Sequence, residues 1–335
     1  MSAITKSAAE WETLAIGALS DSGAIDEVAR SVASALIAAE RDGLPSHGLA
    51  RLQPYCAQLE SGKVRGDVRP ELIEIGDSSA RVDAADGFAF PAFDLAIDTL
   101  VGMTAHDPMV AAAVTNSHHF GVAGYHVERL ASRGLVGMVF GNSPAAIAPW
   151  GGHRKLFGTN PIAFAAPRRG HPPLVIDLSL SKQARGKIML ASKQGRPIPE
   201  GWALDAEGNS TTDPDAALAG SMVPMGEAKG SALVLAVEIL SAALTGAHFG
   251  FEASSFFSAE GDPPRVGQLL LAFVPGPFSG GTFFDRIEVL LRAIEEQPGA
   301  RLPGGRRLQA RAKADAEGIE VPEELAGWLE ERARG

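Results

Sequence analysis

The chain has 335 residues, 45% of them hydrophobic, and a formal net charge of −10, which is typical of a globular protein with one large domain or two moderate ones. The negative charge argues against a general binder of nucleic acids or anionic membranes, because such proteins present basic faces. The single cysteine, Cys56, excludes an intrachain disulfide, so the sequence does not require an oxidising compartment.

The N-terminal segment carries Glu10 and Glu12 and lacks the basic start and apolar run of a signal peptide. The apolar stretch "SALVLAVEILSAALTGA" is interrupted by Glu238 and is shorter than the ~18 apolar residues of a membrane span. We therefore expect a cytoplasmic protein.

Two helices are predicted at the start of the chain. Apolar residues recur every three or four positions over 24–43, and Gly43 is a natural stop. The segment "SHGLARLQPYCAQLESGK" that follows predicts another helix, whose first turn Ser46 is able to cap.

The pattern changes from about Glu71, where short apolar runs bounded by Gly, Pro, Asn or Asp predict strands. These runs cover 71–76, 109–116, 135–142, 161–167, 173–179 and 268–274. Helical segments are predicted between them at Ala92–Thr104, Ala123–Arg133 and Lys229–Leu244, and again in the tail over 283–297, 306–318 and 322–333.

This order of elements predicts an α/β fold with two parts. We expect an α/β domain over 72–281 and a discontinuous helical domain built from both chain ends, 1–71 and 282–335. Several common motifs are missing: no two glycines lie two positions apart, so the G-x-G-x-x-G turn of a Rossmann fold is absent. The P-loop and G-x-S-x-G motifs are absent as well, which argues against a kinase-like NTPase and an α/β-hydrolase.

The histidine-rich segment "NSHHFGVAGYHVERL" has three interpretations. His118, His119 and His126 are possible zinc ligands, but adjacent histidines point in different directions and H-E-x-x-H is absent. They are otherwise polar residues of a strand-to-helix loop. In the third interpretation, Gly121 and Gly124 allow a phosphate to approach the backbone N–H groups at the start of a helix.

The segment "ERDGLPSHGLARL" places a hydroxyl, an imidazole and a guanidinium at one corner. In a helix that starts at Ser46, His47 and Arg51 are four apart and share a face. An arginine fork can hold a substrate carboxylate while the histidine protonates a neighbouring heteroatom. The alternative is a capping serine followed by a surface His and Arg, and the spacing alone does not decide between the two.

Five segments together resemble the malate/L-lactate dehydrogenase-like oxidoreductases. They are "DGLPSHGLARLQPY", "NSHHFGVAGYHVERLASRGLVGMVFGNS", "WGGHRKLFGTNPIAFAAPR", "GEAKGSALVLAVEILSAALTG" and "RLPGGRR", and they span about residues 25–320 in the family's order. This family uses a nicotinamide cofactor without a Rossmann fold, so the resemblance implies a non-Rossmann, mixed-sheet cofactor domain and explains the missing G-x-G.

The resemblance also implies site residues. His47 would be the proton donor, oriented by Ser46, and Arg51 would hold the substrate carboxylate. Further substrate contacts would come from Thr159, Arg185 and Gly186. With His118 in support, the cofactor would be bound by His119, Phe120, Gly121, Val122, Ala123, Asp177, Leu178, Ser179, Lys229, Arg301, Leu302, Pro303, Gly304, Gly305, Arg306 and Arg307. No metal site is expected.

The stretch "RLPGGRR" contains three arginines and no acid, which suits a 2′-phosphate and favours NADPH, with NADH as a possible cofactor. The alternative is a solvated basic loop before a helix. Within the family, "ERDG", "GEAKGSAL" and "RLPGGRR" look most similar to the Δ1-piperideine-2-carboxylate/Δ1-pyrroline-2-carboxylate reductases. The sequence departs from several relatives at Glu227–Gly230 and around Arg185.

We therefore expect an NADPH-dependent imine reductase that forms L-proline or L-pipecolate from the cyclic imino acids. The first alternative is an NAD(P)-dependent malate/L-lactate-type 2-hydroxyacid dehydrogenase. The second alternative is a non-catalytic ligand-binding homodimer that keeps the scaffold. A homodimer is expected from the resemblance alone.

Overall fold

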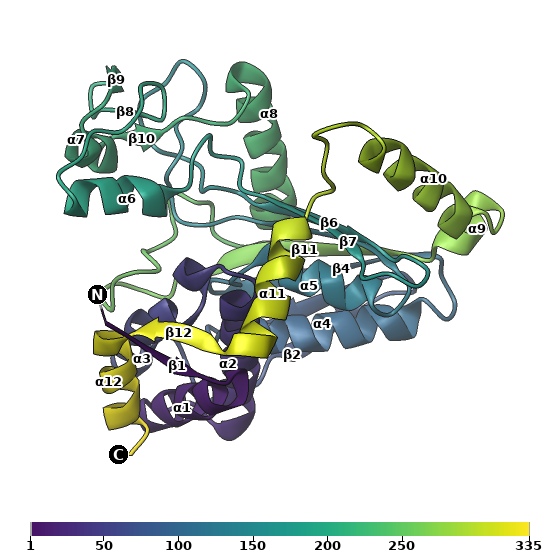
Figure 1. The fold of residues 1–335 in the computed structure, drawn as a ribbon, viewed down its shortest axis with the longest axis horizontal. Helices are drawn as coiled ribbons and strands as arrows, with labels where there is room; N and C mark the ends of the chain where they lie inside the picture. Colours follow the sequence, from purple (N-terminus) through teal and green to yellow (C-terminus); the bar gives the residue numbers. More distant parts are fainter. Residues whose placement is uncertain (1, 335) are drawn as a thin grey trace.

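A seven-stranded sheet forms the centre of the computed structural model, which describes residues 2–334 (Figure 1). Within these residues β3 and β4 are the one parallel pair of this sheet, and its other pairs are antiparallel. The predicted α/β class with a mixed sheet is therefore confirmed. A Rossmann sheet, by contrast, is mostly parallel. In spatial order the strands are β2 (Glu71–Ile75), β3 (Ser79–Asp83), β4 (Met109–Ser117), β11 (Val266–Phe273), β5 (Val136–Gly141), β6 (Ile162–Ala166) and β7 (Leu174–Leu178).

Helices cover both faces of this sheet because successive strand residues point to opposite sides. On β11, Leu270 packs with the helices α4 (Ala89–Met103) and α5 (Ala123–Ala131). Its neighbour Leu269 packs on the other side against Val234 of α8 (Glu227–Glu238). One π-helical turn (Ile239–Ala243) continues α8. Of the helices described, none combines the length and apolar character needed to cross a membrane.

A smaller unit extends from the α8 face. It contains a three-stranded sheet in the order β10-β8-β9 and two short helices (Figure 1). Its buried residues continue the apolar cluster under α8. The elements are α6 (Arg185–Lys193), β8 (Ala203–Leu204), β9 (Ser210–Thr211), α7 (Pro214–Ala219) and β10 (Ser221–Met222).

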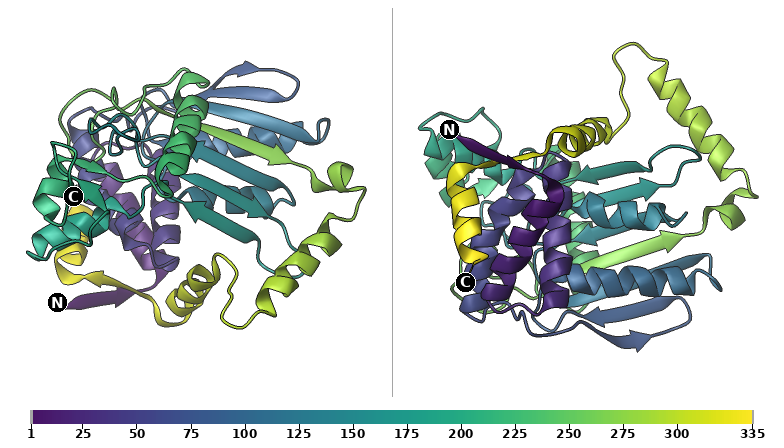
Figure 2. Two further views of the ribbon diagram at one scale, coloured as in Figure 1. Left: turned by 90° about the horizontal axis from the view of Figure 1, so that it is seen from above. Right: turned by 60° about the horizontal axis from the view of Figure 1, so that its bottom comes forward.

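The two chain ends meet in one helical layer beside the sheet (Figure 2). The short strands β1 (Ala3–Lys6) and β12 (Ile319–Pro322) pair antiparallel, and the Trp11 indole N–H donates to the carbonyl of Ile319 at 3.0 Å. The buried core of this layer draws on residues 11–64 and 319–329. Its helices are α1 (Ala8–Asp21), α2 (Asp26–Arg41), α3 (Leu52–Glu60) and α12 (Glu323–Arg332).

Two features differ from the sequence predictions. The helix predicted from Ser46 begins at Leu52, after two 3-10 turns separated by Gly48, so its N-cap is Arg51 and not Ser46. The helix α10 (Phe283–Glu295) lies with α9 (Pro275–Ser279) at the far end of the sheet, away from α1 and α12 (Figures 1 and 2). The domain boundaries proposed from the sequence remain a prediction.

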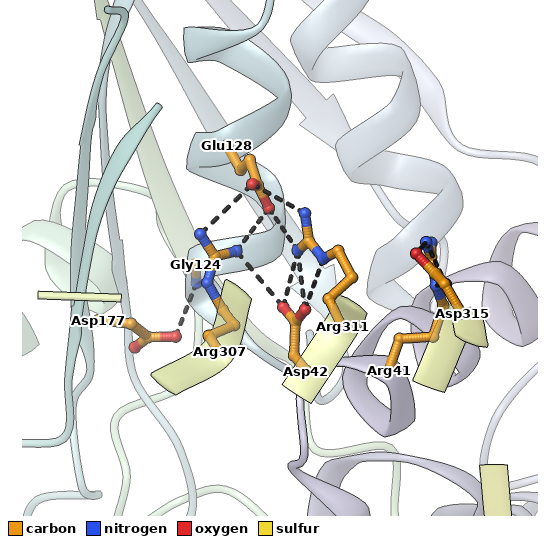
Figure 3. Close-up of polar contacts among 8 residues, drawn as sticks. All are labelled: Arg41, Asp42, Gly124, Glu128, Asp177, Arg307, Arg311 and Asp315. Atoms are coloured by element: carbon orange, nitrogen blue, oxygen red, sulfur yellow. Dashed lines mark hydrogen bonds and ion pairs between the residues drawn. The ribbon is translucent and has the colours of Figure 1, made fainter. Parts of the chain in front are cut away.

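Helix α11 (Gly305–Glu317) is fixed to the body by a buried charge network (Figure 3). Arg311 donates to Asp42 at 2.8 Å and to Glu128 at 2.9 Å, and Arg307 donates to the same two carboxylates. The Asp42 side chain is 4% exposed and that of Glu128 13% exposed. Burial raises the pKa of Glu128, but the hydrogen bonds from Arg311 and Arg307 outweigh it and leave the pKa lowered. The network joins α11 to α2 and α5.

We predict that Arg311→Met lowers the free energy of unfolding by about 2–3 kcal/mol, because it leaves two poorly solvated carboxylates with one guanidinium. Arg41→Met is the matched control, since it removes the more exposed Arg41–Asp315 pair between the same two helices. Its effect should stay below about 1 kcal/mol. Urea denaturation measures both, and equal effects would contradict the role given to the network.

Candidate active site

One edge of the Arg51 guanidinium lacks a hydrogen-bond partner among the described residues. The side chain sits in the second 3-10 turn and is 9% exposed. Its Nε donates to the carbonyl of Ser46 at 2.8 Å, whereas its Nη1 is buried and has no hydrogen-bond partner within residues 2–334. A buried donor without a partner costs free energy, and a bound carboxylate would satisfy it.

His47 lies at the same corner as Arg51. Its Nδ1 is 3.1 Å from the Ser46 hydroxyl oxygen, and its ring stacks on that of His119 with centroids 5.7 Å apart. Loss of hydration, with the nearby charge of Arg51, lowers the pKa of His47 to about 4. The imidazole is therefore neutral at pH 7, and an anion bound at Arg51 would raise its pKa by offsetting the arginine charge.

Tyr55 fixes the orientation of His119. The Tyr55 hydroxyl is 2.6 Å from His119 Nδ1, and the tyrosine is fully buried. Burial raises the pKa of Tyr55 above its usual value, so the hydroxyl keeps its proton and can donate a hydrogen bond to Nδ1. With this direction of the bond, neutral His119 carries its own proton on Nε2. Tyr55 was not predicted as a site residue. The available signal was its position four residues after Arg51, which is a helical spacing.

The other two histidines of this segment have separate environments. The His118 ring packs against Tyr55 and Phe88, and burial, with the charges of Lys63 and Arg51, lowers its pKa to about 3. His126 Nε2 is 2.8 Å from the Phe120 carbonyl. Across residues 2–334, no group of three or more His, Cys, Asp or Glu side chains is arranged to hold a metal.

Two aromatic residues of a distant loop complete this corner. Phe256 packs against both His118 and His119, and the Phe257 ring lies 4.6 Å from the guanidinium carbon of Arg51. Neither residue was predicted from the sequence as part of the site. Their only signal was an aromatic pair within the polar stretch "EASSFFSAE".

Three of the predicted cofactor-binding segments lie together at the start of α5. The N–H of Gly124 donates to Asp177 Oδ2 at 2.7 Å (Figure 3). Gly304 has a φ of +81°, and a Cβ on it would lie 3.2 Å from the Val175 carbonyl, so the 301–307 loop runs beside β7. One of the three interpretations of this segment placed a phosphate at the N–H groups here, but the Gly124 N–H donates to the carboxylate of Asp177, which lies in the favourable position at a helix N-terminus.

The predicted arginines of the 301–307 loop differ in their pairing. Arg307 is compensated by Asp42 and Glu128, so it is not the free cation that the sequence suggested. Arg301 and Arg306 are exposed and make no ion pair within residues 2–334. These two guanidiniums fit the phosphate of a nucleotide cofactor.

Other predicted residues form a second group near the smaller unit. The Leu180 N–H donates to the Thr159 carbonyl at 2.8 Å, and the Met225 N–H donates to the Leu180 carbonyl at 2.8 Å. These bonds join the segment after β7, which includes Ser179, to the loop before α8, where Lys229 is exposed in the first turn. Arg185 begins α6 and is half-buried, with the exposed Gly186 next to it.

The remaining predicted residues vary in exposure, and none of their roles is tested by these contacts. Phe120 and Ala123 are buried, Gly121, Val122, Leu302 and Gly305 are half-buried, and Leu178 and Pro303 are exposed.

We predict that Tyr55→Phe lets the proton of His119 exchange between its two ring nitrogens. Nitrogen-15 NMR of the imidazole measures this, and the lost hydrogen bond should lower the free energy of unfolding by about 1–2 kcal/mol. Tyr125→Phe, at the other tyrosine of the chain, is the control. An unchanged His119 spectrum in Tyr55→Phe would contradict the orienting role.

Known proteins resemble this chain over nearly its whole length. The family model described as malate/L-lactate dehydrogenase matches residues 7–330. A (2R)-3-sulfolactate dehydrogenase (NADP(+)) from Chromohalobacter salexigens is 58% identical over 96% of this chain and 95% of its own. A Δ1-pyrroline-2-carboxylate/Δ1-piperideine-2-carboxylate reductase from Pseudomonas putida is 40% identical over 92% of this chain and 91% of its own.

The same likeness holds for a solved structure. The Δ1-piperideine-2-carboxylate reductase from Pseudomonas syringae pvar. tomato has a TM-score of 0.93 and 38% identity, over 98% of this chain and 99% of the other. The family expected from the sequence motifs is confirmed. The chain belongs to the malate/L-lactate dehydrogenase family and is an NAD(P)-dependent oxidoreductase.

Proposed function

We propose that the protein is an NADP(H)-dependent 2-hydroxyacid dehydrogenase that interconverts 3-sulfolactate and 3-sulfopyruvate or a closely similar acid pair. The observation that carries this proposal is the buried, unpartnered Arg51 Nη1 beside a neutral His47. The 58% identity to a sulfolactate dehydrogenase, against 40% to the imine reductase, favours a hydroxy acid. This reverses the order of the two activities expected from the sequence.

Arg51 binds the substrate carboxylate through the open edge of its guanidinium. Such pairs are directional because two parallel N–H donors match two carboxylate oxygens. A sulfonate needs a second cation, for which we propose Arg185. Burial lowers the pKa of Arg185, so an anion there would be favourable. Burial, with the nearby charge of Arg185, lowers the pKa of Lys155, so Lys155 lies close to Arg185 and would also gain from an anion bound there.

His47 moves the proton. In the oxidation direction its neutral imidazole accepts the proton of the substrate hydroxyl, and in the reduction direction the imidazolium returns it to the carbonyl oxygen. The nicotinamide, when bound, supplies or accepts the hydride. Ser46 holds the imidazole through Nδ1. His119 offers its Nε2–H as a hydrogen-bond donor at the same corner.

The proposed preference for NADPH is supported by Arg301 and Arg306. Neither is paired with a carboxylate in the part of the chain described here, and both can face a 2′-phosphate. Arg307 instead holds α11 in place, and we propose that it supports the loop without binding the phosphate itself.

A second candidate activity is the reduction of cyclic imino acids. The 38% identical reductase structure with a TM-score of 0.93 favours it. The same Arg51 would bind the imino acid carboxylate. The hydride would reach the imine carbon, and the nitrogen would be protonated.

We also propose a homodimer. The outer side of α8 and its π-helical turn exposes large apolar residues, including Leu235, Ile239 and Leu244, of which Leu244 is 62% exposed. Contiguous apolar surface of this kind is typical of an interface. Sedimentation should give twice the chain mass, and Ile239→Glu with Leu244→Glu should shift it to the monomer mass. A wild-type monomer would refute this assignment.

The activity is tested by a substrate panel with NADPH and with NADH. We expect the highest kcat/KM with sulfopyruvate and NADPH, and lower values with pyruvate, oxaloacetate and the two cyclic imines. Arg185→Gln should raise the KM for sulfopyruvate more than the KM for pyruvate, because pyruvate has no second anion. Faster turnover of an imine would favour the second candidate. NADPH binding without turnover of any substrate would favour a non-catalytic protein.

The pKa of His47 gives the pH dependence a definite sign. Because the free enzyme has a His47 pKa of about 4, kcat/KM for reduction should fall as the pH rises above that value, and kcat/KM for oxidation should stay level. The carboxylate offsets Arg51, so kcat should show a higher apparent pKa than kcat/KM. His47→Gln should lower kcat about 100-fold or more and abolish this dependence. A pH profile that His47→Gln leaves unchanged would rule out this proton donor.

A further inference from the structure

The loop of residues 254–262 reaches the candidate active site from the other half of the chain. It carries Phe256, which is 6% exposed and packs 5.1 Å from His118 and 5.2 Å from His119, measured between ring centroids. It also carries Phe257, which is 53% exposed although its ring lies over Arg51. Single exposed apolar side chains are common on protein surfaces, and what distinguishes this ring is its position over the arginine of the candidate site.

Lys63 holds this loop in an unusual way. The side chain is buried, with 3% exposure. Its ammonium donates to the carbonyls of Ser255, Ser258 and Glu260 at 2.8, 2.9 and 2.8 Å. It makes no ion pair with a carboxylate within residues 2–334. Three carbonyls of one loop therefore take all three donors of the lysine.

The same helical segment adds further bonds to the loop. Gln58 Nε2 donates to the carbonyls of Phe256 and Ser258 at 2.9 and 3.1 Å, and the Ser61 hydroxyl donates to the Ala259 carbonyl at 2.9 Å. Gln58 belongs to α3, which begins directly after Arg51. The segment that follows Arg51 thus also fixes the backbone that carries the two phenylalanines.

We propose that Phe257 is a substrate-binding residue that determines specificity, and that Lys63 is a positioning residue that acts through the loop of residues 254–262. This inference rests on the proposed binding of a substrate carboxylate by Arg51. The guanidinium carbon of Arg51 lies over the Phe257 ring, and the Ser46 carbonyl accepts the hydrogen bond from Nε. The edge with Nη1 is left for the carboxylate, in the plane of the guanidinium. An arginine can stack on a ring and bind a carboxylate at its edge simultaneously.

The ring has two physical effects in this position. It keeps water from one side of the ion pair, and charges attract more strongly when water is excluded. It also forms a wall beside the carboxylate, so the substituent on the neighbouring carbon must be compact on that side. Lys63 sets the distance of this wall by fixing three successive parts of the loop.

The direct test compares Phe257→Ala with Phe251→Ala. Phe251 is 50% exposed in the same connection and stacks on Phe249 at 5.6 Å, so it is a matched control. We expect Phe257→Ala to raise the KM of the keto acid about fivefold to tenfold, the range of one cation–π contact. The KM of NADPH should change less than about twofold, and Phe251→Ala should resemble the wild type. Equal KM values in wild type and Phe257→Ala would overturn the specificity role.

The positioning role is tested with Lys63→Met and Lys63→Arg. Hydrogen exchange of peptides covering 254–262 should be faster in Lys63→Met, with the same rise in keto-acid KM as in Phe257→Ala. Lys63→Arg should restore much of both, because it keeps the charge and several donors. Faster exchange without a change in KM would show that the loop is not part of the site. If Lys63→Met does not fold, Gln58→Leu removes two of the same loop bonds and gives the same comparison.

A binding measurement separates this inference from the activity. Calorimetry with oxalate, a small carboxylate, needs no turnover. If the wild type reduces none of the acids but Phe257→Ala still binds oxalate more weakly, the proposed activity fails and the inference stands. If the wild type turns over a keto acid but oxalate affinity is the same in Phe257→Ala, the activity stands and the inference fails.

Discussion

The position of Arg51 depends on the absence of a side chain at Gly48. A Cβ there would lie 2.4 Å from Glu40 Oε1, the atom that accepts the Leu49 N–H at 2.7 Å. Glu40 therefore satisfies a backbone donor at the start of the second 3-10 turn, where no earlier carbonyl is available. Because Gly48 separates the two 3-10 turns, the Arg51 side chain can reach back to the Ser46 carbonyl. Its Nη1 is then left buried without a hydrogen-bond partner in the described part of the chain.

The charge of Arg51 contributes to the low pKa of the histidines around it. Burial is the largest cause of the low pKa of His47 and His119, and the Arg51 charge lowers both further. Neutral rings can stack and keep fixed tautomers, whereas two imidazolium groups at this distance would repel each other. A carboxylate bound at Arg51 reverses part of this effect. In the proposed function, substrate binding and proton transfer are therefore electrostatically coupled.

The mixed sheet explains why the site draws on distant segments. The loop after β4 carries the histidines, and the connection before β11 carries the two phenylalanines. β4 and β11 are antiparallel neighbours, so the end of one strand lies beside the start of the other. This edge of the sheet faces the 3-10 turns that hold Arg51. The helix α11, which joins the 301–307 loop to the helical layer, is held at the same side by charge pairs with Asp42 and Glu128.

The family, the α/β class and most of the regular elements could be predicted from the sequence. The reason is local: apolar periodicity marked α2, α4 and α8, and short bounded apolar runs marked β4 to β7 and β11. The motif S-H-G-x-x-R identified His47 and Arg51, which lie at one corner in two 3-10 turns and not on one face of a helix that starts at Ser46. The strands β1, β3, β8, β9, β10 and β12 were missed; all of them except β3 have at most four residues, which is too few for a periodic signal.

Which charged side chains are paired within the protein and which are not depends on the tertiary packing. The sequence could not distinguish Arg307 from Arg301, because the carboxylates that pair with Arg307 lie 265 and 179 residues away in the chain. The same holds for Tyr55, Lys63 and Phe257, whose partners come from distant loops. Asp177 was expected to bind the cofactor. In the structure it accepts a hydrogen bond from the Gly124 N–H, because strand β7 lies next to α5. Pairing between residues far apart in sequence follows from packing, which no local pattern encodes.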